Sequence, residues 1–404
     1  MPPATTQIDG KPRRISSIDA YRGFVMFLML AECLPLAHGA ERFPESEVWQ
    51  SLKHHTSHVE WRGCSLHDLI QPSFSFLVGV ALPFSLAGRA AQGVSRSLFH
   101  AAWRSLALIA LGIFLRSDGR KLTNFTFEDT LSQIGLGYFF LFLLGYARPV
   151  WHRVAFGAIL VVYWAAFVAY PAPPADFDYA AVGVPATWPH HATGLAAHWN
   201  LNSNLAWDFD TWFLNLFPRD SEFRFNGGGY ATLSFIPTLA TMILGLIAGT
   251  WMKSGGTSRS VLLRLFVAGV LALGAGYGLD ALGICPNIKK LWTPAWVLYS
   301  GGICFLLLAV FVVLFDVLPL RILALPLIVI GANSIFIYAF SHLAQDWLVQ
   351  SFDTHFAMFE RKWDFRLYDI AGPEYQSLIR GGLILCLYWI ILTWMYRQKL
   401  FVKI

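Results

Sequence analysis

The chain has 404 residues, of which 56% are hydrophobic and only 14% are charged. An ordinary soluble domain has roughly 25% charged residues. A soluble protein of this length would lack the polar side chains to cover its surface, so the composition excludes that class and indicates a protein solvated by a lipid bilayer. The net charge of +5 is accounted for by basic loops on one side of a membrane, so we expect no nucleic-acid partner.

Membrane-spanning helices are predicted from the apolar runs. A helix needs roughly 20 residues to cross about 30 Å of hydrocarbon, and its backbone amides bond within the segment because lipid offers them no partner. We therefore predict an all-α polytopic membrane bundle of about ten transmembrane helices. In chain order they lie at residues 21–38, 67–86, 98–115, 129–146, 154–170, 230–252, 260–279, 295–315, 322–343 and 378–396.

The positions of lysine and arginine predict the orientation. We expect the protein to lie in a bacterial inner membrane with both termini in the cytoplasm. This orientation places most basic loop residues on the cytoplasmic side, as the positive-inside rule requires. These residues are Lys11, Arg13, Arg14, Arg89, Arg96, Arg148, Arg153, Lys253, Arg259, Arg321, Arg397, Lys399 and Lys403. The pairs Arg120–Lys121 and Lys289–Lys290 fall on the other side, which marks their two loops as candidates for function.

The domain organisation is predicted to be simple. Residues 1–18 are expected to form a cytoplasmic tail, and residues 19–404 a single transmembrane domain without internal repeats. Large outer loops are expected at about 39–66, 171–229 and 344–377. Because the polar residues gather on one face, we expect the substrate to bind there. The second loop mixes aromatic and acidic side chains, which suits a sugar, although an interfacial aromatic belt explains the same residues.

Histidines in the first outer loop are candidates for chemistry. His54, His55 and His58 precede Glu60, and Asp68 opens the second predicted helix. Histidine is the usual general base near neutral pH. We expect no metal, because this histidine spacing is not the helical pattern of zinc sites. A solvated loop with incidental histidines is the alternative.

Glu32 lies near the outer end of the first predicted helix. A carboxylate inside the bilayer is costly, so it is a functional candidate by default. The alternative is a structural ion pair with Arg104 or Arg116.

Other polar side chains lie in or beside later helices. They are Gln133 in the fourth helix, Lys290 and Trp292 before the eighth, and Asn333 and Ser334 in the ninth, which follow one face together with Tyr338 and His342. Such a polar stripe is expected to face the bundle interior or a wet cavity. Hydrogen bonding between helices is the alternative role.

A set of motifs, taken together and in order, resembles the heparan-alpha-glucosaminide N-acetyltransferase family and its bacterial relatives. The resemblance covers nearly the whole chain. The matching segments are RISSIDAYRG at 14–23, HVEWRG at 58–63, DLIQP at 68–72, FLVG at 76–79, TLSQIGLGY at 130–138, TLSFIPTLATMILG at 232–245, KLWTPAW at 290–296 and GANS at 331–334.

The resemblance implies a transmembrane enzyme that takes acetyl from cytoplasmic acetyl-CoA and delivers it to an extracytoplasmic sugar. His58 aligns with the family's catalytic histidine, either as general base or as acetyl carrier, and we add Glu32 and Asp68 as catalytic candidates. Where the family has an asparagine, this chain has Cys33 beside Glu32, or Glu47 when counted back from His58. The expected acetyl-CoA ligands are Gln133, Lys290, Trp292, Asn333 and Ser334, with Arg89, Arg96, Arg148 and Arg153 as candidates for the phosphates.

A second functional class stays open at this stage. The same polar interior would suit a non-catalytic membrane carrier of a glycan, a lipid-linked sugar or an acyl donor. The acceptor group, amine or hydroxyl, is open too, as is the oligomeric state, with a homodimer as one option.

Overall fold

A computed structural model describes residues 16–88, 93–318, 320–364, 366–402 and 404. Most of the predicted tail therefore lies outside the described residues, as do Arg89 and Lys403 among the predicted cytoplasmic basic residues. Within the described part every regular element is helical, and the β-pairing there is limited to one bridge between Arg62 and Ile288. The predicted all-α membrane bundle is confirmed.

Each segment predicted to span the membrane contains a helix. In chain order these helices are α1 (Ser16–Leu30), α4 (Ile70–Gly88), α5 (Val94–Arg116), α6 (Thr130–Leu144), α7 (Pro149–Ala169), α9 (Phe235–Gly255), α10 (Arg259–Ala281), α11 (Pro294–Val312), α12 (Arg321–Ala332) with α13 (Ser334–Trp363), and α14 (Gln376–Arg397). Three shorter helices lie in the connections: α2 (Leu36–Arg42), α3 (Glu47–His55) and α8 (Leu205–Phe213).

The number of full spans is lower than the predicted ten. Among the described residues, seven helices are long and apolar enough to cross a membrane, and eight if the bent pair of α12 and α13 counts as one span. Helices α1 and α6 have 15 residues each, which is ~22 Å at 1.5 Å per residue. The apolar run of the first segment continues past Leu30, but its helix ends there and a short 3₁₀ turn at Ala31–Cys33 follows.

The ninth segment also differs from its prediction. Helices α12 and α13 meet at an angle of 63° instead of forming one straight span. Asn333 stands at the break, where its side chain bonds the backbone of Leu400 and Val402 in the C-terminal segment. Helix α13 then continues to Trp363, through residues that were expected to form a loop.

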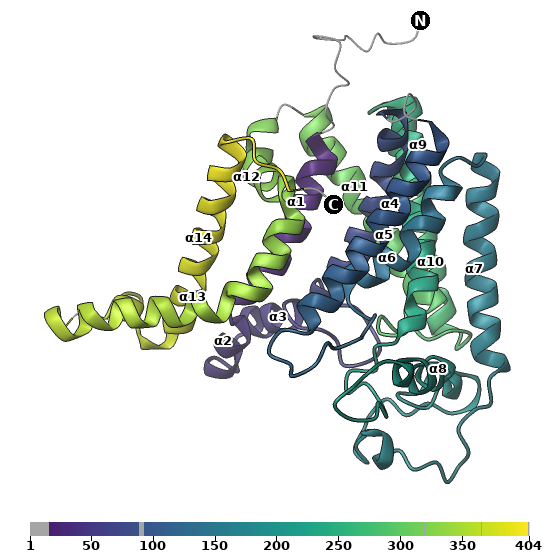
Figure 1. Cartoon of the computed structure of the whole chain (residues 1–404), viewed down its shortest axis with the longest axis horizontal. Helices are drawn as coiled ribbons and strands as arrows, with labels where there is room; N and C mark the ends of the chain where they lie inside the picture. The colour runs from purple at the N-terminus through teal and green to yellow at the C-terminus, as the bar shows by residue number, and fades with distance from the viewer. Residues whose placement is uncertain (1–15, 89–92, 319, 365, 403) are drawn as a thin grey trace, which may run out of the picture.

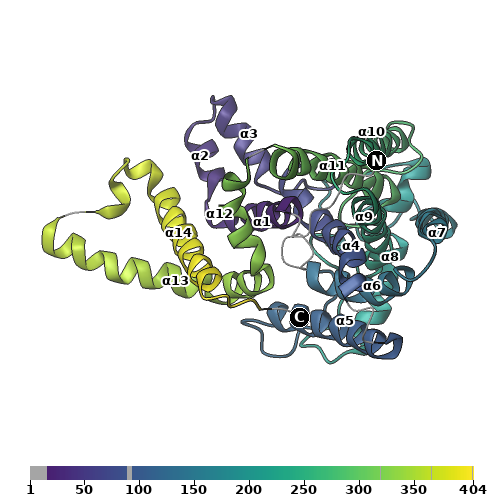
Figure 2. The ribbon, with the colours of Figure 1, turned by 90° about the horizontal axis from the view of Figure 1, so that it is seen from above.

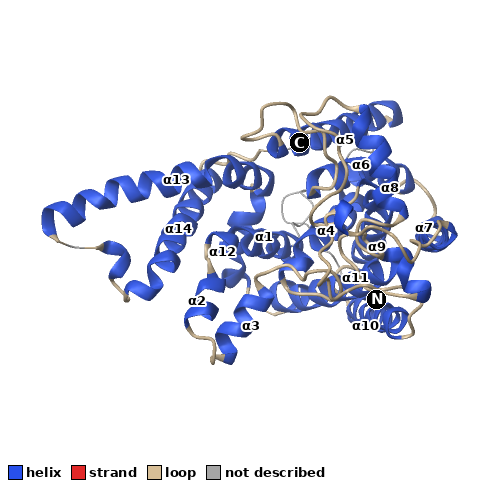
Figure 3. Cartoon of the chain, turned by 90° about the horizontal axis from the view of Figure 1, so that it is seen from below, coloured by secondary structure: helices blue, strands red, loops and turns tan. Residues whose placement is uncertain are grey.

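The helices define two faces of the molecule (Figure 1). We call the face at which α1 begins and α14 ends the terminal face, and the opposite one, which holds α3 and α8, the loop face. Helix α9 is central, with 72% of its span buried, whereas only 17% of the span of α7 is buried. Helices α1, α12, α13 and α14 form a group beside the main bundle, and α13 reaches far outward from it (Figures 2 and 3).

Large apolar side chains point outward from the peripheral helices. Phe99 on α5, Val161 on α7 and Leu271 on α10 are each more than 60% exposed. Large apolar side chains exposed on several helices are expected to contact lipid and not water. The chain is therefore an integral, multi-pass membrane protein.

Small residues bring the central helices into close contact. Gly79 on α4 lies against the backbone of Met242 on α9. One turn further on, Gly245 on α9 lies against the backbone of Phe76 on α4. Neither position has room for a Cβ atom, so backbone contact, the usual basis of helix association in lipid, fixes how α4 sits on α9.

We expect Gly245→Val to lower stability by about 1–3 kcal/mol, because the added methyl groups overpack a closed helix contact. The measurement is the unfolding temperature of the purified protein in detergent. Gly274→Val on α10 is the control, since no atom lies within 4 Å of a Cβ at that position. Equal unfolding temperatures for the two variants would contradict the packing described for α4 and α9.

Candidate active site

The loop that carries His58 is held against the connection between α10 and α11. Arg62 pairs with Ile288 in the β-bridge, and its guanidinium lies 2.7 Å from Asp280. Next to it, the N–H of Gly63 donates to the carbonyl of Asn287 at 3.2 Å. These contacts join two segments more than 200 residues apart, so the loop at the loop face has a defined position.

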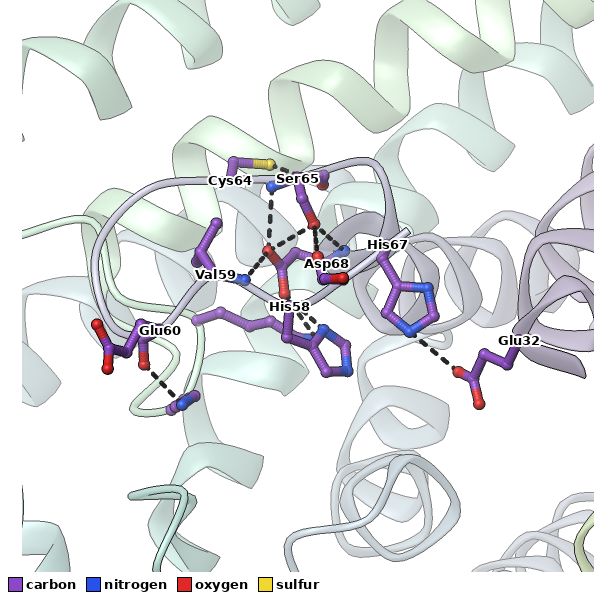
Figure 4. Close-up of polar contacts among 11 residues, drawn as sticks. Glu32, His58, Val59, Glu60, Cys64, Ser65, His67 and Asp68 are labelled. Carbon is purple, nitrogen blue, oxygen red and sulfur yellow. Dashed lines mark hydrogen bonds and ion pairs between the residues drawn. The ribbon is translucent and has the colours of Figure 1, made fainter. Parts of the chain in front are cut away.

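Asp68 organises this loop from the first turn before α4. Its Oδ2 accepts hydrogen bonds from the backbone N–H of Val59 at 3.2 Å and of Ser65 at 3.0 Å, and the Ser65 hydroxyl lies 2.9 Å away. Its Oδ1 lies 2.8 Å from Nδ1 of His58, as Figure 4 shows. The side chain of Asp68 is only 1% exposed, so this carboxylate holds the histidine from a site shielded from water.

A lysine completes the group. The ammonium of Lys289 lies 3.1 Å from Oδ1 of Asp68 and 3.1 Å from Nδ1 of His58. Burial lowers the pKa of Lys289, while the neighbouring Asp68 carboxylate opposes that shift. A buried carboxylate without a counterion would be costly, and Lys289 supplies that counterion.

The environment of His58 favours its neutral form. Burial lowers its pKa most, and the charges of Lys289 and His67 lower it further, against the opposing effect of Asp68. The Asp68 carboxylate only accepts hydrogen bonds, so Nδ1 donates and Nε2 keeps its lone pair. With 43% of its side chain exposed, His58 presents a lone pair to the loop face, as a base or nucleophile requires.

Glu32 lies beside this group, as an ion-pair partner of histidine and not of arginine. Its Oε1 is 3.0 Å from Nε2 of His67, and the ring of His67 lies 4.4 Å from that of His58. The alternative expectation of a pair with Arg104 or Arg116 is therefore wrong. Among the described residues, no group of three or more His, Cys, Asp and Glu side chains is placed to hold a metal ion.

A cavity of about 760 Å³ lies between α4, α5 and α6 on one side and α1, α12 and α13 on the other. Its wall on α4 runs from Phe74 to Ser85, about 16 Å along the helix. Towards the terminal face its polar lining includes Arg22 and His100, and Arg104 lies further in.

The α4 wall of the cavity begins near the site in sequence. Phe74, its first residue on α4, comes six residues after Asp68, which lies in the 3₁₀ turn before this helix. Tyr338, which also lines the cavity, stacks on His342, and His342 belongs to the electrostatic surroundings of Glu32. Tyr338 and His342 thus connect the cavity wall to the electrostatic surroundings of Glu32 along one face of α13.

The predicted acetyl-CoA ligands occupy different places. Ser334 lines the cavity, and Asn333 holds the C-terminal segment whose Phe401 and Val402 line it as well. Gln133 is buried and donates to the carbonyls of Phe127 and Thr232. Trp292 is buried and donates to Thr241, and Lys290 donates to the carbonyl of Glu60. A role for these residues in binding acetyl-CoA stays a prediction.

Sequence reasoning left out three residues that the fold places at the site. Ser65 and His67 are short-range neighbours of Asp68, whereas Lys289 comes from another loop. One signal pointed to Lys289: its loop violates the positive-inside rule. That signal did not distinguish it from Lys290, whose ammonium faces the rings of Trp61 and Tyr230 instead.

Removing the charge of Lys289 should raise the pKa of His58, because one of the two charges that disfavour its protonated form is lost. We expect Lys289→Met to move the midpoint for modification of His58 by diethyl pyrocarbonate, which reacts with neutral imidazole, to higher pH. Mass spectrometry of the His58 peptide gives the midpoint. Lys290→Met is the control and should leave it unchanged; an unchanged midpoint in both variants would contradict the proposed electrostatics.

Comparison with known proteins gives distant relatives. No protein-family model matches the chain. Heparan-alpha-glucosaminide N-acetyltransferase of Homo sapiens is 22% identical over an alignment of 443 residues, which covers 100% of this chain and 62% of that protein. The Mus musculus protein of the same name is 22% identical, with 97% and 60% covered. The chain thus spans about three fifths of the length of these relatives and is a distant relative of the heparan-alpha-glucosaminide N-acetyltransferases.

Proposed function

We propose that this protein is a transmembrane acetyltransferase that moves acetyl from acetyl-CoA at the terminal face to a saccharide at the loop face. The observation behind the proposal is the position of His58: its Nδ1 donates to Asp68, the ammonium of Lys289 lies beside it, and its side chain is 43% exposed at the loop face. The names of the distant relatives support the same kind of reaction.

The cavity is the proposed site for acetyl-CoA. Its volume of about 760 Å³ falls within the range of roughly 300–1,000 Å³ that is usual for ligand pockets. Arg22, His100 and Arg104 supply cationic or N–H groups for phosphates or carbonyls. The buried Nε of Arg104 has no hydrogen-bond partner among the described residues, although Nη1 bonds Tyr138. An unsatisfied N–H donor in the wall of a cavity can bind a ligand that is rich in acceptor oxygens.

The chemistry at His58 follows from its surroundings. Asp68 fixes the ring with Nε2 as the lone-pair nitrogen, as the carboxylate does in a catalytic triad. Lys289 keeps a positive charge close to the ring and so favours the neutral imidazole. A neutral histidine with a fixed orientation is suited to receive a proton from the acceptor or to receive the acetyl group itself.

The acceptor is proposed to be an extracytoplasmic sugar or glycan, acetylated on an amino or hydroxyl group. The relatives' name supports an amino sugar for those proteins. We further propose that the terminal face is cytoplasmic, in a bacterial inner membrane. The basic residues described at that face, such as Arg96, Arg148 and Lys253, support this orientation.

The first test of the activity uses membranes that contain the wild type or His58→Ala, with labelled acetyl-CoA and glucosamine as acceptor. We expect transfer to fall by about 10²–10⁴-fold in the variant, the usual contribution of a catalytic base. Binding of acetyl-CoA should change by no more than about twofold, equivalent to roughly 0.4 kcal/mol. Transfer by His58→Ala at the wild-type rate would contradict the role of His58.

The second test fills the cavity. Ala81 lies on its α4 wall, so Ala81→Trp should weaken binding of acetyl-CoA by at least about tenfold, equivalent to roughly 1.4 kcal/mol. The control is Ala158→Trp on α7, at an exposed position that faces away from the bundle. Equal affinities of the two variants, measured by equilibrium binding of labelled acetyl-CoA, would place the donor elsewhere.

A further inference from the structure

Two histidines lie side by side at the loop face, and each has its own carboxylate. His58 is bound to Asp68 at 2.8 Å, and His67 is bound to Glu32 at 3.0 Å. The two rings are 4.4 Å apart and inclined by 54°. Figure 4 shows Glu32 and His67 adjoining His58 on the side away from Glu60. The Glu32–His67 pair is therefore the immediate neighbour of His58.

The two carboxylates are in very different environments. Asp68 is 1% exposed and already accepts bonds from His58, Ser65, Val59 and Lys289. Glu32 is 53% exposed, and within the described part of the chain its Oε2 has no hydrogen-bond partner. Both oxygens of Asp68 are thus occupied by hydrogen bonds within the protein. Glu32 instead has a free oxygen that an acceptor hydroxyl or amine can reach.

The charged and titratable groups around Glu32 come from several elements. They are His67 before α4, His58 in the neighbouring loop, His342 on α13 and Lys289 before α11. All of them carry a positive charge when protonated, so they keep the carboxylate ionised. An ionised carboxylate that is held on one oxygen and open on the other is a competent general base.

We propose that the site divides the reaction between its two pairs: His58 carries the acetyl group, and Glu32, positioned by His67, takes the proton of the acceptor. This inference rests on the proposed acetyltransferase function and assigns separate steps to the two carboxylate–histidine pairs. In this scheme Glu32 contacts the acceptor directly and is therefore a catalytic residue. His67 is a positioning residue, because it acts through the bond to Oε1.

The proton and electron balance is complete with the two substrates alone. Nε2 of His58 attacks the thioester carbon; the new C–N bond forms, the C–S bond breaks, and coenzyme A leaves as thiolate, which takes a proton from water. The acetylated ring is cationic and is stabilised by Asp68. The lone pair of the acceptor oxygen or nitrogen then attacks the acetyl carbon, the C–N bond to His58 breaks with its electron pair returning to Nε2, and the acceptor proton passes to Glu32 and on to solvent.

Separate half-reactions make this division measurable. In membranes with the full chain and labelled acetyl-CoA but no acceptor, we expect one burst of coenzyme A release and label on His58 in the wild type, in Glu32→Gln and in His67→Gln. With glucosamine added, Glu32→Gln should transfer about 10²–10⁴-fold more slowly than the wild type. His67→Gln should lower kcat less than that and leave KM for acetyl-CoA unchanged.

The pH profile separates catalysis from a structural role. Wild-type transfer should fall on the acid side as His58 is protonated and, at lower pH, as Glu32 is protonated. Only the Glu32 step should be absent in Glu32→Gln. The chain supplies a matched control in another Glu–His pair of the same face, Glu60 and His190, at 3.4 Å. Glu60→Gln and His190→Gln should retain both half-reactions and the acid limb.

Several results would overturn the inference. One is a wild type that transfers acetyl without a burst or label on His58. Another is Glu32→Gln that transfers at the wild-type rate, or that loses the burst together with transfer. Failure of the proposed function itself looks different, because the wild type would then transfer no acetyl to any sugar.

Discussion

The ion pair between Asp68 and Lys289 is the interaction on which the site depends. It joins the first turn before α4 to the connection before α11, across 221 residues of sequence. Both side chains are almost fully buried, so removal of either partner would leave an uncompensated charge in the interior. This pair holds His58, and Asp68 also fixes the adjoining loop by accepting hydrogen bonds from the backbone of Ser65 and Val59. The orientation of the histidine is thus a consequence of an electrostatic constraint in the core.

Helix α4 connects this site to the interior. The turn that leads into the helix carries Asp68, and the face of α4 from Phe74 to Ser85 lines the cavity. Gly79 holds the same helix against α9. Since α9 is the most deeply buried span, α4 has a rigid support along its length. Helix α4 therefore connects the proposed donor cavity to the turn whose Asp68 holds His58 at the loop face.

Much of the fold followed from the length of the apolar runs, because lipid requires long apolar helices with their backbone bonds satisfied internally. The exceptions have local causes that composition does not report. Helix α1 ends at Leu30 although the apolar run goes on, so its span is shorter than predicted. The bend at Asn333 depends on bonds to Leu400 and Val402, which are distant in sequence and have no pattern that predicts the contact.

The site was predictable to a similar degree. His58, Asp68 and Glu32 were identified as candidates, and the structure brings all three into one cluster. Lys289 was not chosen, because two adjacent lysines are equivalent in sequence until the fold buries one fully and the other only partly. His67 was given no role, since its partner Glu32 lies in another helical segment. The sequence shows which residue types are present, but it does not show which residues from distant segments pair in the site.

The most direct test of the account is the sidedness of the reaction in sealed vesicles. Acetyl-CoA is supplied on one face of the reconstituted wild type and glucosamine on the other, in both arrangements, and acetylated sugar is measured. The account predicts product when acetyl-CoA is at the terminal face and the sugar is at the loop face, and none in the reverse arrangement. Product only when both substrates share a face would contradict transfer of acetyl from the cavity to His58 and across the membrane.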